Sequence, residues 1–127
     1  MNGQPASVVH VVDGDPAVRD SLTTLLDLNG FRVASYATGS AFLKELTASM
    51  TEGGQDWIVC EADLPDGSGI DLYNRIREAR AGNPFILLVS RRNPKIIETA
   101  KNAGIEQVYQ KPLVHRNLIS YIETRSH

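Results

Sequence analysis

Five short apolar runs, which alternate with stretches of helical spacing, constrain the fold of this chain more than any other feature. The runs occupy residues 7–12, 32–37, 57–61, 85–90 and 107–110. Short runs rich in branched apolar residues are typical of strands that are buried on both faces. Because consecutive parallel strands need a crossover, which is usually a helix, the alternation predicts an α/β fold with a five-stranded parallel sheet and helices on both faces.

Proline and glycine mark the ends of several expected helices. Pro16 stands where the first helix should begin, and Gly30 and Gly104 follow two helical stretches as stop signals. The third helical stretch runs to about Ala81, and the polar residues 62–69 before it are expected to form a loop. The apolar stripe of the first helix consists of Val18, Leu22, Leu25 and Leu26. We interpret residues 1–127 as a single domain without internal repeats.

Composition excludes several classes of protein. A net charge of -2 argues against direct nucleic-acid binding by this domain, because neutralising phosphates needs a basic face. Cys60 is the one cysteine, so neither an internal disulfide nor a zinc cluster is expected. The chain has no long apolar run that could span a membrane and no signal-peptide pattern, which favours a cytoplasmic location. It also lacks a glycine-rich phosphate loop and a nucleophile elbow, so we do not expect an enzyme.

Polar residues follow four of the five expected strands. Asp13 follows the first strand, Glu61 ends the third, Ser90 ends the fourth and Lys111 follows the fifth. The carboxyl ends of parallel strands meet at one edge of an open α/β sheet, where such proteins carry their functional sites. The sequence therefore predicts a polar cluster at this edge.

Three motifs in this order resemble the receiver domain of bacterial two-component response regulators. They are "VVDGDPAVRDSL", "LPDGSG" and "QKPL", and the resemblance spans about residues 7 to 123. It implies a flavodoxin-like sheet with strand order 2-1-3-4-5, and a histidine kinase or another signalling protein as partner. A homodimer is left open, and no membrane contact is implied. The opening helix is most similar to receivers that precede a helix-turn-helix output domain.

In that family, an acidic pair after the first strand holds Mg²⁺. Asp13 matches the first acid, but Gly14 stands at the position of the second, and Asp15 follows it. Mg²⁺ requires oxygen ligands in a near-octahedral array, so the loss of one carboxylate leaves at most a weak metal site at Asp13 and Asp15. Asp15 has a second interpretation, which we favour, as the N-cap of the helix that begins at Pro16.

The family's phosphoacceptor is an aspartate four residues before a proline. Counting back from Pro65 gives Glu61, whose carboxylate lies one methylene further out. Phosphoryl transfer depends on positioning, so Glu61 is expected to accept phosphate poorly. Asp63 and Asp66 are nearby acids, but they lie in the loop and not at the strand end.

The residues that contact phosphoryl oxygens in the family are a hydroxyl and a lysine. Lys111, with Pro112 after it, matches the lysine, and we favour it as a counter-charge to Glu61 over an ordinary surface lysine. Ser90 matches the hydroxyl, although strict counting would place Val89 there.

Two further departures concern the surroundings of this site. Arg91 or Arg92 could fold over the pocket and pair with an acid, and a solvated loop arginine is the alternative. Val108 stands at the family's switch position, and its neighbour Tyr109 should point to the opposite face, because side chains alternate along a strand.

The sequence therefore predicts an atypical receiver that signals through protein–protein interaction, with impaired Mg²⁺-dependent phosphoryl acceptance and no cofactor. The alternative is a functional receiver, phosphorylated on Glu61 or a nearby aspartate by a histidine kinase, that controls a DNA-binding output domain.

Overall fold

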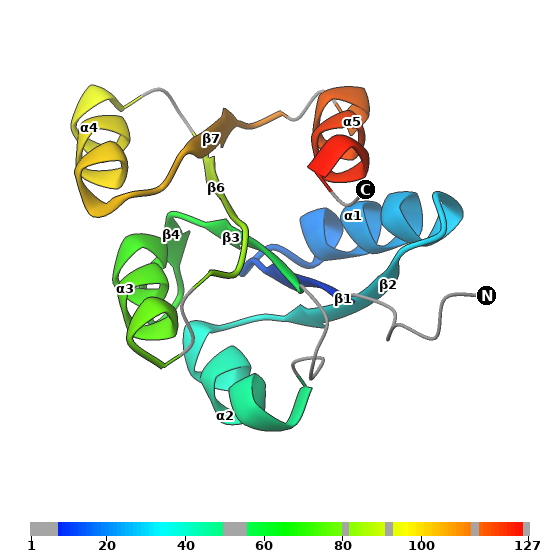
Figure 1. The fold of residues 1–127 in the computed structure, drawn as a ribbon, viewed down its shortest axis with the longest axis horizontal. Coiled ribbons are helices and arrows are strands. Elements are labelled where there is room, and N and C mark those ends of the chain that lie inside the picture. Colours follow the sequence, from blue (N-terminus) through cyan, green and yellow to red (C-terminus); the bar gives the residue numbers. More distant parts are fainter. Residues whose placement is uncertain (1–7, 50–55, 80–81, 91–92, 113–114, 126–127) are drawn as a thin grey trace.

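The computed structural model describes residues 8–49, 56–79, 82–90, 93–112 and 115–125. Its main sheet has five parallel strands in the order β2-β1-β3-β6-β7 (Figure 1). These strands are β1 (Val8–Val12), β2 (Arg32–Tyr36), β3 (Trp57–Glu61), β6 (Phe85–Val89) and β7 (Gln107–Gln110). By position this is the order 2-1-3-4-5, so the predicted fold class is confirmed.

Helices cover both faces of the sheet (Figure 1). They are α1 (Pro16–Leu28), α2 (Gly39–Ser49), α3 (Gly69–Ala79), α4 (Pro94–Ala103) and α5 (His115–Arg125). Buried residues of α1 and α5 form one core against the sheet, and those of α2, α3 and α4 form the other. In the described part of the chain, no helix combines the length and the apolar character needed to cross a membrane.

The burial of the central strands explains why their sequences are continuously apolar. All five residues of β3 and all five of β6 are buried, because each strand has a neighbour on both sides and a core on each face. Successive residues contribute to opposite cores, as Val59 and Cys60 do. The polar Glu61 is buried as the last residue of β3.

The predicted helix ends are confirmed at three positions. Pro16 is the first residue of α1, and the preceding Asp15 accepts a hydrogen bond from the Ala17 amide at 2.9 Å. Gly30 and Gly104 follow α1 and α4 with φ angles of 87° and 106°, a left-handed conformation that favours glycine.

The predicted loop over residues 62–69 contains regular structure instead. It holds an antiparallel pair of two-residue strands, β4 (Asp63–Leu64) and β5 (Gly67–Ser68), before α3 begins at Gly69. Segments this short carry too little alternation to be recognised from sequence. A side chain on Gly69 would collide with the carbonyl of Glu61, so this glycine lets α3 start directly against the end of β3.

Sequence reasoning also missed a buried polar network. Nε2 of His10 lies 2.8 Å from Oδ2 of Asp56, and both side chains are fully buried. The other imidazole nitrogen, Nδ1, lies 3.2 Å from the hydroxyl of Tyr36, and Oδ1 of Asp56 accepts the Val8 amide at 3.1 Å. Asp56 therefore joins the beginnings of β1 and β3 to the end of β2 inside the core.

We predict that Asp56→Ala lowers the free energy of unfolding by about 3 kcal/mol, because the His10 and Val8 donors lose their buried acceptor. Chemical denaturation measures the loss. Asp27→Ala, on the exposed surface of α1, is the matched control and should change stability by less than about 0.5 kcal/mol. Equal effects for the two variants would show that the network contributes nothing.

Candidate functional site

Four polar side chains meet at the carboxyl ends of the strands, as the sequence predicts. Nζ of Lys111 lies 2.7 Å from Oδ2 of Asp13 and 3.3 Å from Oε2 of Glu61. The hydroxyl of Ser90 donates to the same Oε2 at 2.9 Å. The strand order causes this convergence, because β1, β3, β6 and β7 are successive neighbours in the sheet.

Lys111 is the central cation of this cluster. Burial alone would lower its pKa, but the hydrogen bond and charge of Asp13, with the charge of Glu61, outweigh burial and raise the pKa. The side chain therefore stays an ammonium ion at neutral pH. Its interpretation as a counter-charge to Glu61 agrees with this geometry, and it is not an ordinary surface lysine.

Glu61 is held in an environment that disfavours its charged form. Burial raises its pKa most, and the neighbouring Asp13 raises it further, while Ser90 and Lys111 act in the opposite direction. The net shift is upward. The carboxylate points at Ser90 and Lys111. These two residues match the hydroxyl and the lysine that contact phosphoryl oxygens in the receiver family.

Each oxygen of the Asp13 carboxylate has a partner within the protein. Oδ2 contacts Lys111, and Oδ1 accepts the backbone N–H of Asp15 at 2.9 Å. Arg19 of α1 donates to the Asp13 carbonyl at 2.7 Å, a contact that sequence reasoning missed. Asp15 itself is exposed and caps α1, which confirms the favoured N-cap interpretation.

Pro65 packs closely against Gly14. A β-carbon on Gly14 would lie 2.7 Å from Cγ and 2.9 Å from Cδ of the Pro65 ring. At such distances the proline ring or residue 14 must shift. The proline thus lies against the place where the second acid of the family's metal pair would extend.

These donors do not fit a tight magnesium site. Asp13 is already neutralised by an ammonium ion, Gly14 offers no oxygen from a side chain, and Asp15 is engaged at the end of α1. Among the described residues, no group of three or more acidic, histidine or cysteine side chains is arranged to hold a metal ion.

The two loop acids differ in their environments. Asp63 is exposed in β4. Asp66 accepts from the amides of Gly39 and Ser40 at 2.9 and 2.8 Å, and from the Ser40 hydroxyl at 2.7 Å. These hydrogen bonds lower the pKa of Asp66, and the bond from the Ser40 hydroxyl has the largest effect. Asp66 therefore caps α2 and ties the β4–β5 hairpin to that helix.

The remaining expectations concern the rim of the site. Val108 packs in the core beneath α2, α3 and α4, whereas Tyr109 packs in the core beneath α1 and α5. The prediction that these two neighbours face opposite ways is confirmed. Burial, and then the neighbouring Tyr121, raise the pKa of Tyr109. Arg91 and Arg92 lie outside the described residues, so their proposed pairing stays a prediction.

We predict that Glu61→Gln stabilises the protein relative to wild type increasingly as the pH rises above 4.5, the ordinary value for this carboxyl. A carboxyl whose pKa is raised on folding stabilises the folded state while protonated and loses that contribution as it ionises. Each unit of upward shift corresponds to about 1.4 kcal/mol. Thermal unfolding between pH 4 and 7 measures the difference in stability between the variant and wild type. Glu123→Gln, at an exposed position of α5, is the control. A difference that stays constant with pH would contradict the raised pKa.

We also predict that Gly14→Ala lowers stability by about 1–3 kcal/mol, because a single methyl group must displace Pro65. The double variant Gly14→Ala/Pro65→Ala should recover most of this loss. Chemical denaturation checks both. If the single variant is as stable as wild type, the loop that carries Pro65 moves aside without a loss of folding free energy.

Comparison with known proteins agrees with this geometry. The response regulator receiver domain family matches residues 9–123. The transcriptional regulatory protein FixJ of Rhizobium meliloti is 29% identical over 118 residues, which cover 93% of this chain and 56% of that protein. The response regulator protein TmoT of Ectopseudomonas mendocina is 27% identical over 124 residues, 98% of this chain and 54% of that protein. The chain thus spans about half the length of these curated relatives.

Solved structures show the same fold. A CheY-like receiver domain protein from Methanospirillum hungatei superimposes with a TM-score of 0.85 at 23% identity, covering 95% of this chain and 94% of that one. The crystal structure of FixJ-N gives a TM-score of 0.82 at 27% identity, with 97% and 95% covered. The family match over nearly the whole chain, together with the site at the carboxyl ends of the strands, shows that this chain belongs to the response regulator receiver domain family.

Proposed function

We propose that this chain is an atypical receiver, which signals through contacts with other proteins and does not depend on Mg²⁺-assisted phosphorylation. The observation that carries the proposal is the contact of Lys111 with both Asp13 and Glu61. The ammonium ion engages both acids and offsets one of their two charges, while Gly14 offers no side-chain oxygen that would complete a metal pair.

The acceptor position supports the same conclusion. A carboxylate attacks phosphorus only when it is ionised and free to approach, and positional errors of about 1 Å can cost roughly 100-fold in rate. Glu61 is engaged by Ser90 and Lys111, and its side chain is one methylene longer than that of aspartate. Each of these features opposes phosphoryl acceptance.

The state of the pocket follows from the same contacts. The hydroxyl of Ser90 donates to Glu61, as it would to an oxygen of a phosphorylated acceptor. Glu61 resembles a phosphorylated acceptor only in part, because a carboxylate carries a charge of -1 and a phosphoryl group about -1.5 to -2. We infer a domain held near one conformation, whose regulation comes from a partner protein. By extension from FixJ, a transcriptional regulatory protein, the pathway ends in control of transcription.

We predict that incubation with acetyl phosphate and Mg²⁺ leaves the intact mass of the wild-type protein unchanged. Glu61→Asp alone should also stay unmodified, because the metal position is still incomplete and Pro65 still lies against Gly14. The triple variant Gly14→Asp/Glu61→Asp/Pro65→Ala rebuilds both acids and removes the clash, and it should gain one phosphoryl group.

A stoichiometric mass gain of one phosphoryl group on the wild-type chain would overturn the proposal in favour of a functional phosphoacceptor. Peptide mapping would then distinguish Glu61 from the loop acids Asp63 and Asp66. Borohydride trapping of the acyl phosphate identifies the modified carboxyl.

A further inference from the structure

A cleft of about 410 Å³ lies between α1 and the end of the sheet that carries the polar cluster. Its apolar wall is formed by three residues of α1 and one proline, which are Ala17, Val18, Leu22 and Pro112. Ser90 and Lys111, two members of the polar cluster, line the same cleft. Sites for small molecules usually combine such a volume, mostly apolar walls and a few polar groups at one place.

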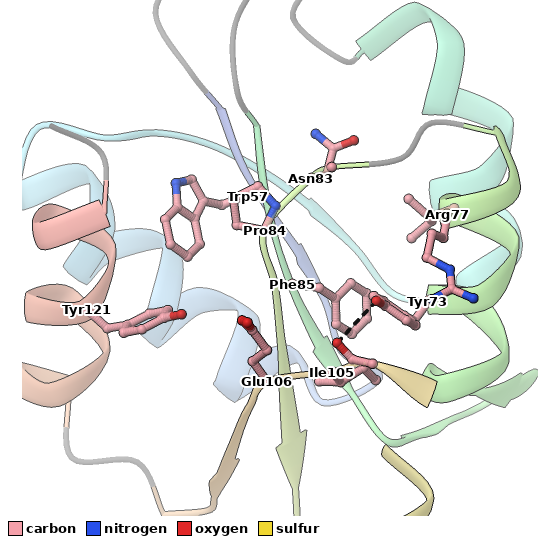
Figure 2. A pocket seen from close by; sticks show the side chains of 12 residues that line it. Trp57, Tyr73, Arg77, Asn83, Pro84, Phe85, Ile105, Glu106 and Tyr121 are labelled. Carbon is pink, nitrogen blue, oxygen red and sulfur yellow. Dashed lines mark hydrogen bonds between the residues drawn. The ribbon is translucent and has the colours of Figure 1, made fainter. Parts of the chain in front are cut away.

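The cavity at the amino edge of the sheet has a different character (Figure 2). Its volume is about 380 Å³, and Trp57 and Tyr121 meet edge to face in its wall with ring centroids 5.7 Å apart. The hydroxyl of Tyr73 already donates to the Gly104 carbonyl at 3.3 Å, and Arg77 lies over the Tyr73 ring. Because these polar groups bind within the protein, the cleft beside α1 is the stronger candidate for a ligand.

The ammonium group of Lys111 has hydrogen-bonding capacity left for a ligand. An ammonium group carries three protons that can be donated. In the described part of the chain it contacts two acceptors, Asp13 at 2.7 Å and Glu61 at 3.3 Å. The hydroxyl of Ser90 donates its one proton to Glu61, so its oxygen can still accept a bond. The polar end of the cleft therefore favours a ligand that presents an oxygen acceptor to Lys111.

The charge of the cluster favours an uncharged ligand. When both acids are ionised, Asp13, Glu61 and Lys111 together have one more negative charge than positive charge. Beside them, Arg19 donates to the Asp13 carbonyl and Asp15 caps α1, which adds one charge of each sign. An anionic ligand would meet this excess of negative charge, and a cationic ligand would meet the ammonium group of Lys111 without an acceptor to offer it.

We propose that the cleft binds a small uncharged molecule with an apolar body and one carbonyl oxygen. The body lies against Val18, Leu22 and Pro112, and the oxygen accepts a hydrogen bond from Lys111. This site goes beyond the proposed function, because its occupancy is measured on the unmodified chain and does not depend on whether Glu61 accepts phosphate.

Titration of the full chain with acetophenone tests the site directly. The amide signals of Val18, Leu22 and Ser90 in two-dimensional NMR spectra should shift saturably, with a dissociation constant on the order of 1 mM. The signal of Trp57, in the wall of the other cavity, should not shift. Calorimetry on the same samples gives an independent affinity.

Three analogues separate the parts of the proposal. Toluene lacks the carbonyl oxygen, acetone lacks the ring and benzoate carries a negative charge. Each should bind about ten-fold more weakly than acetophenone, because a hydrogen bond to a charged group is lost, apolar contact is lost, or charge repulsion is added.

A substitution that fills the cleft provides a test on the protein side. Ser21 is an exposed residue of α1 that lines the cleft, so Ser21→Leu should occupy part of its volume and weaken acetophenone binding about ten-fold. Thr24→Leu, at an exposed position of α1 outside the cleft, is the matched control and should leave the affinity unchanged. Unchanged thermal unfolding of both variants confirms that the loss is local.

The absence of saturable shifts at about 20 mM acetophenone, some twenty-fold above the expected constant, would overturn the proposal. Equal affinity for toluene would reject the hydrogen bond to Lys111 and would indicate an apolar surface that accepts any hydrophobic group, as a side chain of a partner protein would supply. Equal or tighter binding of benzoate would reject the requirement for an uncharged ligand, and shifts confined to Trp57 would place the binding in the other cavity.

Discussion

The contact between Lys111 and two acids organises the carboxyl edge of the sheet. Asp13 is fully buried and Glu61 nearly so, and buried charges are costly unless paired and hydrogen-bonded. The ammonium group lies within 3.3 Å of both carboxylates, and the Ser90 hydroxyl and the Asp15 amide complete their hydrogen bonds. Without this cation, two carboxylates would converge at strand ends that the sheet forces together. The ammonium ion offsets one of the two negative charges, and the other contacts of the site are arranged around this cation.

The neighbouring loop packs against the same site. Pro65 lies against Gly14 where a second acid would extend, and Asp66 fastens the β4–β5 hairpin to the beginning of α2. The changes at residues 14 and 61 are therefore consistent with each other. The absence of a side chain at residue 14 removes one metal ligand and leaves room for the loop to approach. This is the physical basis on which we propose a receiver that works without phosphorylation.

The sheet separates two regions of different chemistry. The carboxyl ends of the strands carry a charged cluster whose members bind one another, whereas the amino ends of β3 and β6 border a cavity lined by aromatic residues. Because β3 and β6 are buried along their whole length, both regions share the same rigid strands.

Much of this structure follows from local sequence. Strand and helix positions, the stops at Gly30 and Gly104, and the opposite directions of Val108 and Tyr109 were predictable, because periodicity and backbone preference act within a few residues. The candidate site was predictable as a set, since parallel strands end at one edge. Only the tertiary structure decided the contacts between residues that are distant in the sequence. These contacts join His10 to Asp56, Gly14 to Pro65, Asp66 to α2, and Trp57 to Tyr121. Packing selects such pairs from many residues of suitable chemistry, and their separation along the chain leaves no local pattern by which sequence alone could specify them.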